Sequence, residues 1–249
     1  GNFAGWDELA TAVQEELERL PEGTPLLAGN FKIGAELGFA FNDPQIEVLD
    51  HPLNHKHGRA PQLRLWNLEN DGRRERPALL VVGHGDVQYK SLLQHYHQLC
   101  EKLGPLPPPR VVNVDHGRQR FLLFALPAEK ASGPCVAPAF AWIDTPASKA
   151  QVGRDFAVQG WAFKDGVGLQ GVEVLLDGQV VGKADYGSPS PGTAAYWQLS
   201  NDPNHPKVGF SARIEGAAAT PGRHWLGLRL HGADGSVEDW SEQPIVISD

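Results

Sequence analysis

The stretch that decides the fold of the first half of the chain is residues 24–49, TPLLAGNFKIGAELGFAFNDPQIEVL. Its first five residues form a short apolar run before a glycine, which is consistent with a buried strand. Asn30 can cap a helix that runs to about Phe41, where Asn-Asp-Pro ends it. Because 46–49 is a second apolar run, the stretch predicts a strand, a helix and another strand.

The sequence on both sides of this stretch continues the alternation of strand and helix. Apolar residues at helical spacing predict amphipathic helices over 6–20 and 89–103. Three more strands are expected, at 78–82, 110–114 and 120–126. The last two are expected to pair antiparallel across a short turn. Strands that alternate with helices predict a three-layer α/β domain with a mainly parallel sheet covered on both faces.

The composition of the chain changes near residue 130. Seven of its ten histidines lie before this point, and five of its seven tryptophans lie after it. The segment Pro127–Pro138 is rich in Pro, Ala and Ser and has no hydrophobic period, which is typical of a linker. We therefore expect an α/β domain over 1–130, a linker over 131–138 and a second domain over 139–249.

The second half shows strand character and no helical pattern. Seven strands are expected, at 140–143, 156–163, 172–176, 180–184, 208–214, 225–230 and 245–247. Asp177-Gly178 and Asp234-Gly235 are typical of hairpin turns. About seven strands in roughly 110 residues predict an all-β immunoglobulin-like sandwich. No disulfide is expected between its sheets, because Cys135 precedes the first strand, and Cys100 is interpreted as a small core residue.

The overall composition is that of a globular protein. The chain has 249 residues, of which 41% are hydrophobic and 21% charged, and its net charge is -8. These values exclude disorder and a collagen-like chain, and the absence of a basic run disfavours a nucleic-acid partner. No run approaches 18 consecutive apolar residues. Because the sequence begins with Gly and contains no Met, we expect an excised or processed form whose membrane spans would lie outside it.

Polar clusters follow three of the predicted strands directly, at 29–32, 50–59 and 83–86. Ligands of an open α/β sheet bind beyond the carboxyl ends of its strands, so these clusters are expected to meet at one edge if the strands are parallel neighbours. The candidate ligand-binding residues are Asn30, Lys32, Glu36, Asp50, His51, Asn54, His57, Arg59, Gln62 and His84. The alternative is that 50–59 is an ordered loop whose side chains satisfy its own backbone.

The charges of this edge indicate a class of ligand. Lys32, Lys56 and Arg59 supply cations near the expected helix N-terminus, so we expect the edge to prefer an anionic or sugar-like group over an apolar one. Arg59 is the candidate for a bidentate phosphate contact. Asn54 and Gln62 are the candidates for binding sugar hydroxyls.

Two alternatives stay open for the same residues. Arg59 could instead bridge Asp50 or Glu36 and only hold the loop together. The three histidines of His51–His57 could converge on a metal ion, as in a metal-assisted hydrolase. No HExxH helix, CxxC pair, P-loop, GxGxxG turn or GxSxG elbow accompanies them, so neither a cofactor nor a metal is expected.

Aromatic residues of the second half form a further candidate site, because pyranose rings pack their apolar faces on aromatic rings. The tryptophans that could form such a platform are Trp142, Trp161, Trp197, Trp225 and Trp240. Trp161 and Trp225 lie within predicted strands and are expected to be buried. Trp197, Tyr196 and Tyr186 lie in the polar 185–206 segment and are the better candidates. Core packing is the alternative for all of them.

Two segments resemble a known family of membrane enzymes. Residues 27–41 (LAGNFKIGAELGFAF) and 48–66 (VLDHPLNHKHGRAPQLRLW) are similar to the soluble C-terminal region of bacterial family-39 glycosyltransferases, and the similarity extends to about Leu126. These polytopic inner-membrane enzymes are related to protein mannosyltransferases and to the aminoarabinose transferase of lipid A modification. They take sugar from a polyprenyl-phosphate donor. The second half resembles the immunoglobulin-like modules of bacterial envelope proteins.

The resemblance implies an accessory region at the periplasmic face of the bacterial inner membrane, attached to a membrane-embedded glycosyltransferase region of the same protein. Its role would be substrate positioning or interaction, with a lipid-linked sugar or glycan as ligand and no cofactor. The catalytic acidic residue of such enzymes lies between membrane helices, so this chain is not expected to transfer sugar itself. Two other interpretations stay open, a free-standing α/β enzyme and a carbohydrate-binding or adhesive module.

Overall fold

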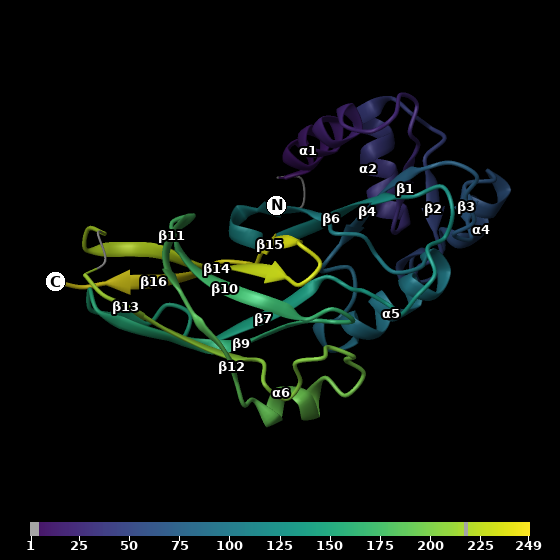
Figure 1. Cartoon of the computed structure of the whole chain (residues 1–249). Helices are drawn as coiled ribbons and strands as arrows, with labels where there is room; N and C mark the ends of the chain where they lie inside the picture. Colours follow the sequence, from purple (N-terminus) through teal and green to yellow (C-terminus); the bar gives the residue numbers. More distant parts are fainter. Residues whose placement is uncertain (1–4, 217–218) are drawn as a thin grey trace. The chain divides into compact units, whose positions relative to one another are not determined.

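The structure is a computed structural model that describes residues 5–216 and 219–249. The chain is mixed α/β and contains several β-sheets, as the alternating pattern predicts. It divides into two compact units, Gly1–Cys135 (unit 1) and Val136–Asp249 (unit 2), which Figure 1 shows in purple to teal and in teal to yellow. The division falls within the expected linker at 131–138.

Unit 1 is built on one six-stranded sheet with the order β3-β2-β1-β4-β6-β5. Its strands are β1 (Leu26–Ala28), β2 (Glu47–Leu49), β3 (Glu69–Asn70), β4 (Ala78–Gly83), β5 (Arg110–Val114) and β6 (Gln119–Leu126). β1 pairs in parallel with β2 and β4, and β2 pairs in parallel with β3. β6 runs antiparallel to β4 and β5. The carboxyl ends of β1, β2 and β4 therefore lie at one edge, and only the two-residue β3 was not expected.

Helices lie on both faces of this sheet (Figure 1). The long ones are α1 (Trp6–Glu18), α2 (Phe31–Phe41) and α5 (Leu92–Leu103), the last preceded by a 3₁₀ turn over Tyr89–Ser91. α1 and α2 share a buried cluster with Leu79 and Val81 of β4. Leu80 and Val82 alternate with these two residues, so they are buried on the opposite face of the sheet. No helix in the described ranges is long and apolar enough to cross a membrane.

Half of the 50–59 segment is helical, so the expectation of a loop was only partly right. It contains α3 (Pro52–Lys56) and is followed by α4 (Ala60–Leu65). His51 caps α3, because its Nδ1 accepts a hydrogen bond from the backbone N–H of Leu53 at 3.1 Å. Both helices carry proline in the first turn, where the missing N–H is not needed. These prolines and the capping histidine were not recognised as helix starts because the segment is rich in polar residues.

The two cysteines form a disulfide, contrary to the interpretation of Cys100 as a core thiol. Their Cα atoms are 5.5 Å apart, although 35 positions separate them in sequence. Spacing along the chain does not report this distance, which depends on how the segment after β6 returns to α5. The bond ties the last residue of unit 1 to α5.

We expect replacement of both cysteines with alanine to lower the free energy of unfolding of unit 1 by about 3 kcal/mol, because the unfolded chain gains the freedom that the closed loop denies it. Urea denaturation of the oxidised protein and of the double variant measures this difference. Adding reductant should lower the stability of the natural protein and leave that of the variant unchanged. Equal stability of oxidised protein and variant would contradict the prediction.

Unit 2 contains two further sheets, with orders β11-β10-β14-β16-β8 and β12-β13-β9-β7, and β15 pairs with β14. The strands are β7 (Ala139–Thr145), β8 (Gln151–Val152), β9 (Phe156–Lys164), β10 (Leu169–Leu176), β11 (Gln179–Lys183), β12 (Asp185–Ser188), β13 (Gly209–Ile214), β14 (Gly222–Gly232), β15 (Val237–Asp239) and β16 (Gln243–Ile247). All seven predicted strands are present. The short β8, β12 and β15 were not expected.

Local geometry explains why one turn of unit 2 was predicted correctly and why one helix was missed. Asp177 and Gly178 both have positive φ, 50° and 78°, and join β10 to β11 as the predicted two-residue hairpin. The expectation that this half has no helix was wrong, because α6 spans Pro191–Tyr196. A helix of six residues is too short to produce a hydrophobic period.

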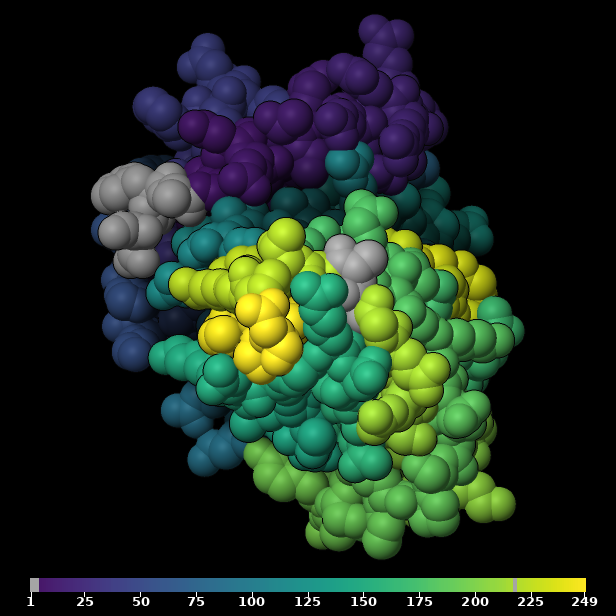
Figure 2. All heavy atoms as spheres, turned by 90° about the vertical axis from the view of Figure 1, so that its left-hand side faces the viewer, coloured from purple at the N-terminus to yellow at the C-terminus, as the bar shows by residue number. Residues whose placement is uncertain are grey.

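The C-terminus of unit 2 reaches the surface, in yellow in Figure 2.

A buried ion pair joins three strands of unit 2. Lys164 Nζ of β9 lies 2.7 Å from a carboxylate oxygen of Glu238 in β15, and each side chain is only 1% exposed. Both oxygens of Glu238 also accept from the backbone N–H of Ala139 in β7, at 3.0 and 3.2 Å. The carboxylate is thus fully paired where no water reaches it.

Candidate functional site

Three side chains connect the loops at the carboxyl edge of the unit 1 sheet. Asn30 caps α2, since its Oδ1 accepts from two backbone N–H groups of the first turn, and its Nδ2 donates to Asp86 at 2.6 Å. Asn54 Oδ1 accepts from the N–H of Phe31 at 2.9 Å, and its Nδ2 donates to the carbonyl of Leu49. The three polar clusters therefore meet at one edge, as the strand-end rule predicts, but both asparagines are occupied in holding it together.

Asp86 lies at the centre of this junction. Its Oδ2 also accepts from the N–H of Gly83, at 3.1 Å. Burial raises the pKa of the Asp86 carboxyl, and the hydrogen bond from Asn30 and the nearby charge of Lys32 oppose that rise. Sequence reasoning missed Asp86 as the partner of Asn30, although it lies in the 83–86 cluster.

Three histidines at this edge, His51, His84 and His95, have pKa values that burial lowers well below the ordinary value. Burial lowers the pKa of His51 to about 4 and that of His95 to about 4, and their rings meet edge to face with centroids 5.1 Å apart. Burial, with the charge of Arg120, lowers the pKa of His84 to about 3. His84 Nδ1 lies 3.4 Å from the Tyr96 hydroxyl. These imidazoles add no positive charge near pH 7.

The three histidines of the 50–59 segment do not converge. His51 is buried as the cap of α3, whereas His55 points outward and its Nε2 lies 2.6 Å from Asp50. The His57 ring packs near Phe31, with centroids 5.6 Å apart. Among the described residues, no group of potential metal ligands within 4.8 Å of one another combines these side chains. The hydrolase alternative therefore has no ligand set here.

The cationic side chains have different surroundings. Arg59 does not bridge Asp50 or Glu36. Its Nη1 donates to Gln62 at 3.2 Å, and its guanidinium lies 6.0 Å from the ring centre of Phe31. Lys32 is exposed, with its ammonium 5.5 Å from the ring centre of a tryptophan in α1. Arg59 thus keeps most of its hydrogen-bond donors available to a ligand.

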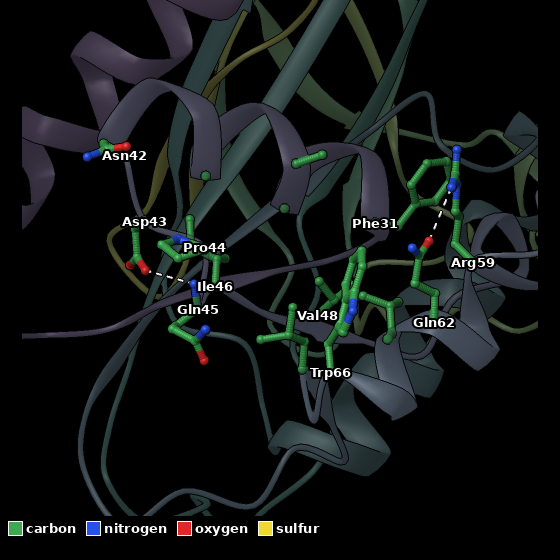
Figure 3. A pocket seen from close by; sticks show the side chains of 15 residues that line it. Phe31, Asn42, Asp43, Pro44, Gln45, Ile46, Val48, Arg59, Gln62 and Trp66 are labelled. Carbon is green, nitrogen blue, oxygen red and sulfur yellow. Dashed lines mark hydrogen bonds between the residues drawn. The ribbon is translucent and has the colours of Figure 1, made fainter.

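A cavity of about 800 Å³ opens beside α2, between that helix, β2 and α4 (Figure 3). We call it the α2 groove. Its middle is apolar, with Ala35 from α2, Val48 from β2 and Leu63 and Trp66 from the α4 region. Trp66 is 55% exposed, so a large ring faces solvent at the wall of the groove. An exposed ring beside an apolar cavity is typical of a binding surface.

The two ends of the α2 groove are polar and differ from each other. Arg59 and Gln62 lie at one end, with Phe31 beside them, whereas Asn42 and Gln45 lie at the other (Figure 3). The second end also carries Asp43 but no cationic side chain among its lining residues. The groove therefore offers an apolar channel with one cation at one end, which suits an elongated amphiphile with an anionic head.

Of the ten candidate residues, only Arg59 and Gln62 line the groove. The apolar lining was not predicted, because the expected preference for an anionic or sugar-like group over an apolar one was based only on the charged and polar side chains of this edge. The signal was present in the sequence as Leu63 and Trp66, three residues apart on the segment that carries Arg59.

The aromatic residues of unit 2 differ from expectation. Trp197 is only 4% exposed, because α6 folds its ring onto the neighbouring sheet, so its choice as an exposed candidate was wrong. Tyr196 is 61% exposed and Trp142 is 52% exposed, whereas Trp161 is partly exposed rather than buried. Tyr186 is half-buried, and its hydroxyl donates to the carbonyl of Ala162.

Comparison with known proteins identifies no family. No protein-family model and no curated protein matches the sequence. Among solved structures, fibronectin(III)-like modules of Clostridium thermocellum CbhA match at 18% identity and a TM-score of 0.29, over 43% of this chain and 94% of theirs. An endo-β-1,4-mannanase from Thermotoga petrophila matches at 9% identity and 0.31, over 45% of this chain and 20% of that chain. CopC from Methylosinus trichosporium OB3b matches at 13% identity and 0.26, over 44% and 94%. Similarities this low do not establish the function of either unit.

Proposed function

We propose that the chain is an accessory ectodomain at the periplasmic face of the bacterial inner membrane. It is attached to a membrane-embedded glycosyltransferase region that uses a polyprenyl-phosphate sugar donor. Unit 1 is a three-layer α/β domain with a mainly parallel sheet, and unit 2 is an immunoglobulin-like sandwich. The α2 groove of unit 1 positions the lipid-linked sugar and performs no chemistry itself.

The α2 groove is the observation that carries the proposal. Both segments that resemble family-39 glycosyltransferases, 27–41 and 48–66, contribute to its walls. An isoprenoid chain is apolar along its length, so its binding over Phe31, Leu63 and Trp66 would be favourable because apolar surface is removed from water. A phosphate at its head would meet Arg59, whose planar guanidinium suits bidentate contact with phosphate oxygens.

The disulfide supports the proposed location. Disulfides form and persist in oxidising compartments such as the bacterial periplasm, and they are rare in the reducing cytosol. The structure brings Cys100 and Cys135 into bonding distance.

The net charge of -8 disfavours nucleic acid as the partner of the chain.

The non-catalytic role is supported by how the polar side chains are used. His51 caps a helix, Asn30 and Asn54 hold loops, and Asp86 accepts from both Asn30 and backbone. None of these groups lines the groove, where a reacting atom would need a nucleophile or base within hydrogen-bond reach. Asp43, the carboxylate among the lining residues, accepts from the backbone N–H of Gln45 at 2.9 Å, at the end away from Arg59. Binding and positioning are the tasks that the groove can perform.

The test uses geranylgeranyl phosphate, below the concentration at which it forms micelles, as a soluble polyprenyl phosphate. Ala35→Trp fills the α2 groove from an exposed position of α2, and Ala40→Trp places the same ring on the same helix outside the groove. We expect the natural chain and Ala40→Trp to bind the probe by calorimetry and Ala35→Trp to bind at least about tenfold more weakly. Equal binding by both variants would contradict the proposal.

Arg59→Ala separates the head from the chain of the ligand. Loss of a charge-assisted contact should weaken geranylgeranyl phosphate binding by about tenfold or more. Geranylgeraniol, which lacks the phosphate, should bind the natural protein and Arg59→Ala equally. An effect of the same size on both ligands would show that Arg59 only shapes the groove.

A further inference from the structure

A second surface, independent of the α2 groove, lies on the outer face of the β12-β13-β9-β7 sheet in unit 2. Side chains alternate along β9, so Phe156, Val158 and Ala162 are buried toward the other sheet while Gln159 and Trp161 face outward. α6 lies on the same outer side, below β9 in Figure 1, and Trp197 at its end packs on Trp161 and Phe163 of β9.

Aromatic rings form a continuous strip on this face. Trp142 of β7 is the direct cross-strand partner of Trp161 of β9, so their side chains stand next to each other. The Trp161 ring lies 6.2 Å from Trp197, and Trp197 lies 4.9 Å from Tyr196. Because Trp197 is buried, it supports a strip whose accessible members are Trp142, Trp161 and Tyr196. We call these three residues the aromatic strip.

A row of hydrogen-bonding groups runs beside the aromatic strip. Gln159 lies two residues before Trp161 and is the cross-strand partner of Ser211 in β13. Ser211 is in turn the partner of Asp185 in β12. Amide, hydroxyl and carboxylate side chains therefore follow one another across three strands on the outer face, and Gln159 and Asp185 are exposed.

We propose that this face of unit 2 binds a neutral oligosaccharide. A pyranose ring has an apolar C–H face and a rim of hydroxyl groups. Its apolar face would stack on Trp142 or Tyr196. Its hydroxyls would reach Gln159, Ser211 and Asp185, which together supply donors and acceptors but little net charge.

The size of the aromatic strip favours a sugar over a protein partner. Trp142 and Tyr196, each a little more than half exposed, offer roughly 250 Å² of accessible surface. A stable protein interface buries about 800 Å² on each partner. The strip also consists of flat rings beside polar groups. One or two sugar rings match this area.

The probes are soluble hexasaccharides of glucose, mannose and N-acetylglucosamine, titrated into the purified chain while tryptophan fluorescence is recorded. We expect at least one to bind. Trp142→Ala should weaken that binding about tenfold, since one stacking contact is lost. Trp142 is exposed on an edge strand, so an unchanged melting temperature should show that the variant folds. Tyr196→Ala provides a second variant on the same strip.

Trp225→Ala is the matched control. Trp225 belongs to the other sheet and is partly exposed, not buried as its place in a strand predicted, with the Arg223 guanidinium 4.8 Å from its ring centre. Its replacement should leave sugar binding unchanged. The proposal is overturned if no hexasaccharide binds at millimolar concentration, or if Trp142→Ala and Trp225→Ala weaken binding equally.

A second copy of the chain is the other occupant to test. Sedimentation should show no self-association that depends on the aromatic strip. A concentration-dependent dimer that Trp142→Ala abolishes would overturn the proposal and assign the face to chain pairing. Both outcomes are independent of the α2 groove, because no residue of the strip belongs to unit 1.

Discussion

The chain should lose several kcal/mol of stability in unit 1 as the pH falls from 6.5 to 4. Burial lowers the pKa of His51 and His95 to about 4 and that of His84 to about 3, from an ordinary value of 6.5. Between these values the unfolded chain binds protons that the folded chain does not, so acid favours unfolding. Each histidine contributes at most about 3 kcal/mol by pH 4.

All three histidines change the stability of unit 1 in the same direction. The stability that depends on their neutral form is fully present above pH 6.5 and is lost as the pH falls toward the pKa values of the folded state. Asp86 acts in the opposite direction, because burial raises its pKa and the folded chain therefore binds a proton more readily than the unfolded chain does. A single carboxyl offsets only part of the loss from three imidazoles.

Hydrogen exchange of the β1 and β4 amides measures this loss in unit 1 of the intact chain. His51→Asn keeps an N-cap acceptor in front of α3 and removes the titrating ring. Between pH 6.5 and 4, the free energy of unfolding of this variant should therefore decrease by about 3 kcal/mol less than that of the natural protein. His57→Asn, at an exposed position, should behave like the natural protein. A pH dependence unaltered by His51→Asn would contradict the assignment.

Replacing Lys164 with alanine should lower the free energy of unfolding of unit 2 by about 4 kcal/mol. The variant leaves the Glu238 carboxylate buried without its cation and opens a cavity where the lysine side chain packs. Hydrogen exchange of β9 and β14 amides reports unit 2 separately from unit 1. Lys183→Ala removes an exposed lysine from β11 and should change stability little.

A double variant identifies the cause of that loss. Lys164→Met with Glu238→Leu removes both charges and keeps most of the volume, so it should recover much of the lost stability. If the double variant is as unstable as Lys164→Ala, the pair contributes through packing and backbone contacts rather than through its charges. The buried location makes either partner alone costly to remove.

Elements with local signals were predictable from the sequence. Asn30 with its following helix was recognised because the capping side chain and the apolar period lie within one segment. The hairpin at Asp177-Gly178 was recognised for the same reason, since both central residues tolerate positive φ. The strands that were missed, β3, β8, β12 and β15, have two to four residues each, too few to show alternation.

The features that depend on distant contacts could not be predicted. The disulfide requires α5 and the end of unit 1 to meet, and the α2 groove requires α2, β2 and α4 to leave space between them. Composition also misled, because the polar 50–59 segment was interpreted as a loop although α3 spans five of its ten residues and His51 caps that helix. Of the candidate residues, Arg59 and Gln62 line the α2 groove, but the apolar residues beside them were not predicted.

A crystal structure of the chain with geranylgeranyl phosphate tests the central proposal most directly, because it locates the ligand as well as detecting it. The account predicts that the isoprenoid lies along α2 between Phe31 and Trp66. Its phosphate should lie within about 3 Å of the Arg59 guanidinium nitrogens. Density for the ligand outside the α2 groove, or a reversed ligand with its phosphate beside Asn42 and Asp43, would contradict it.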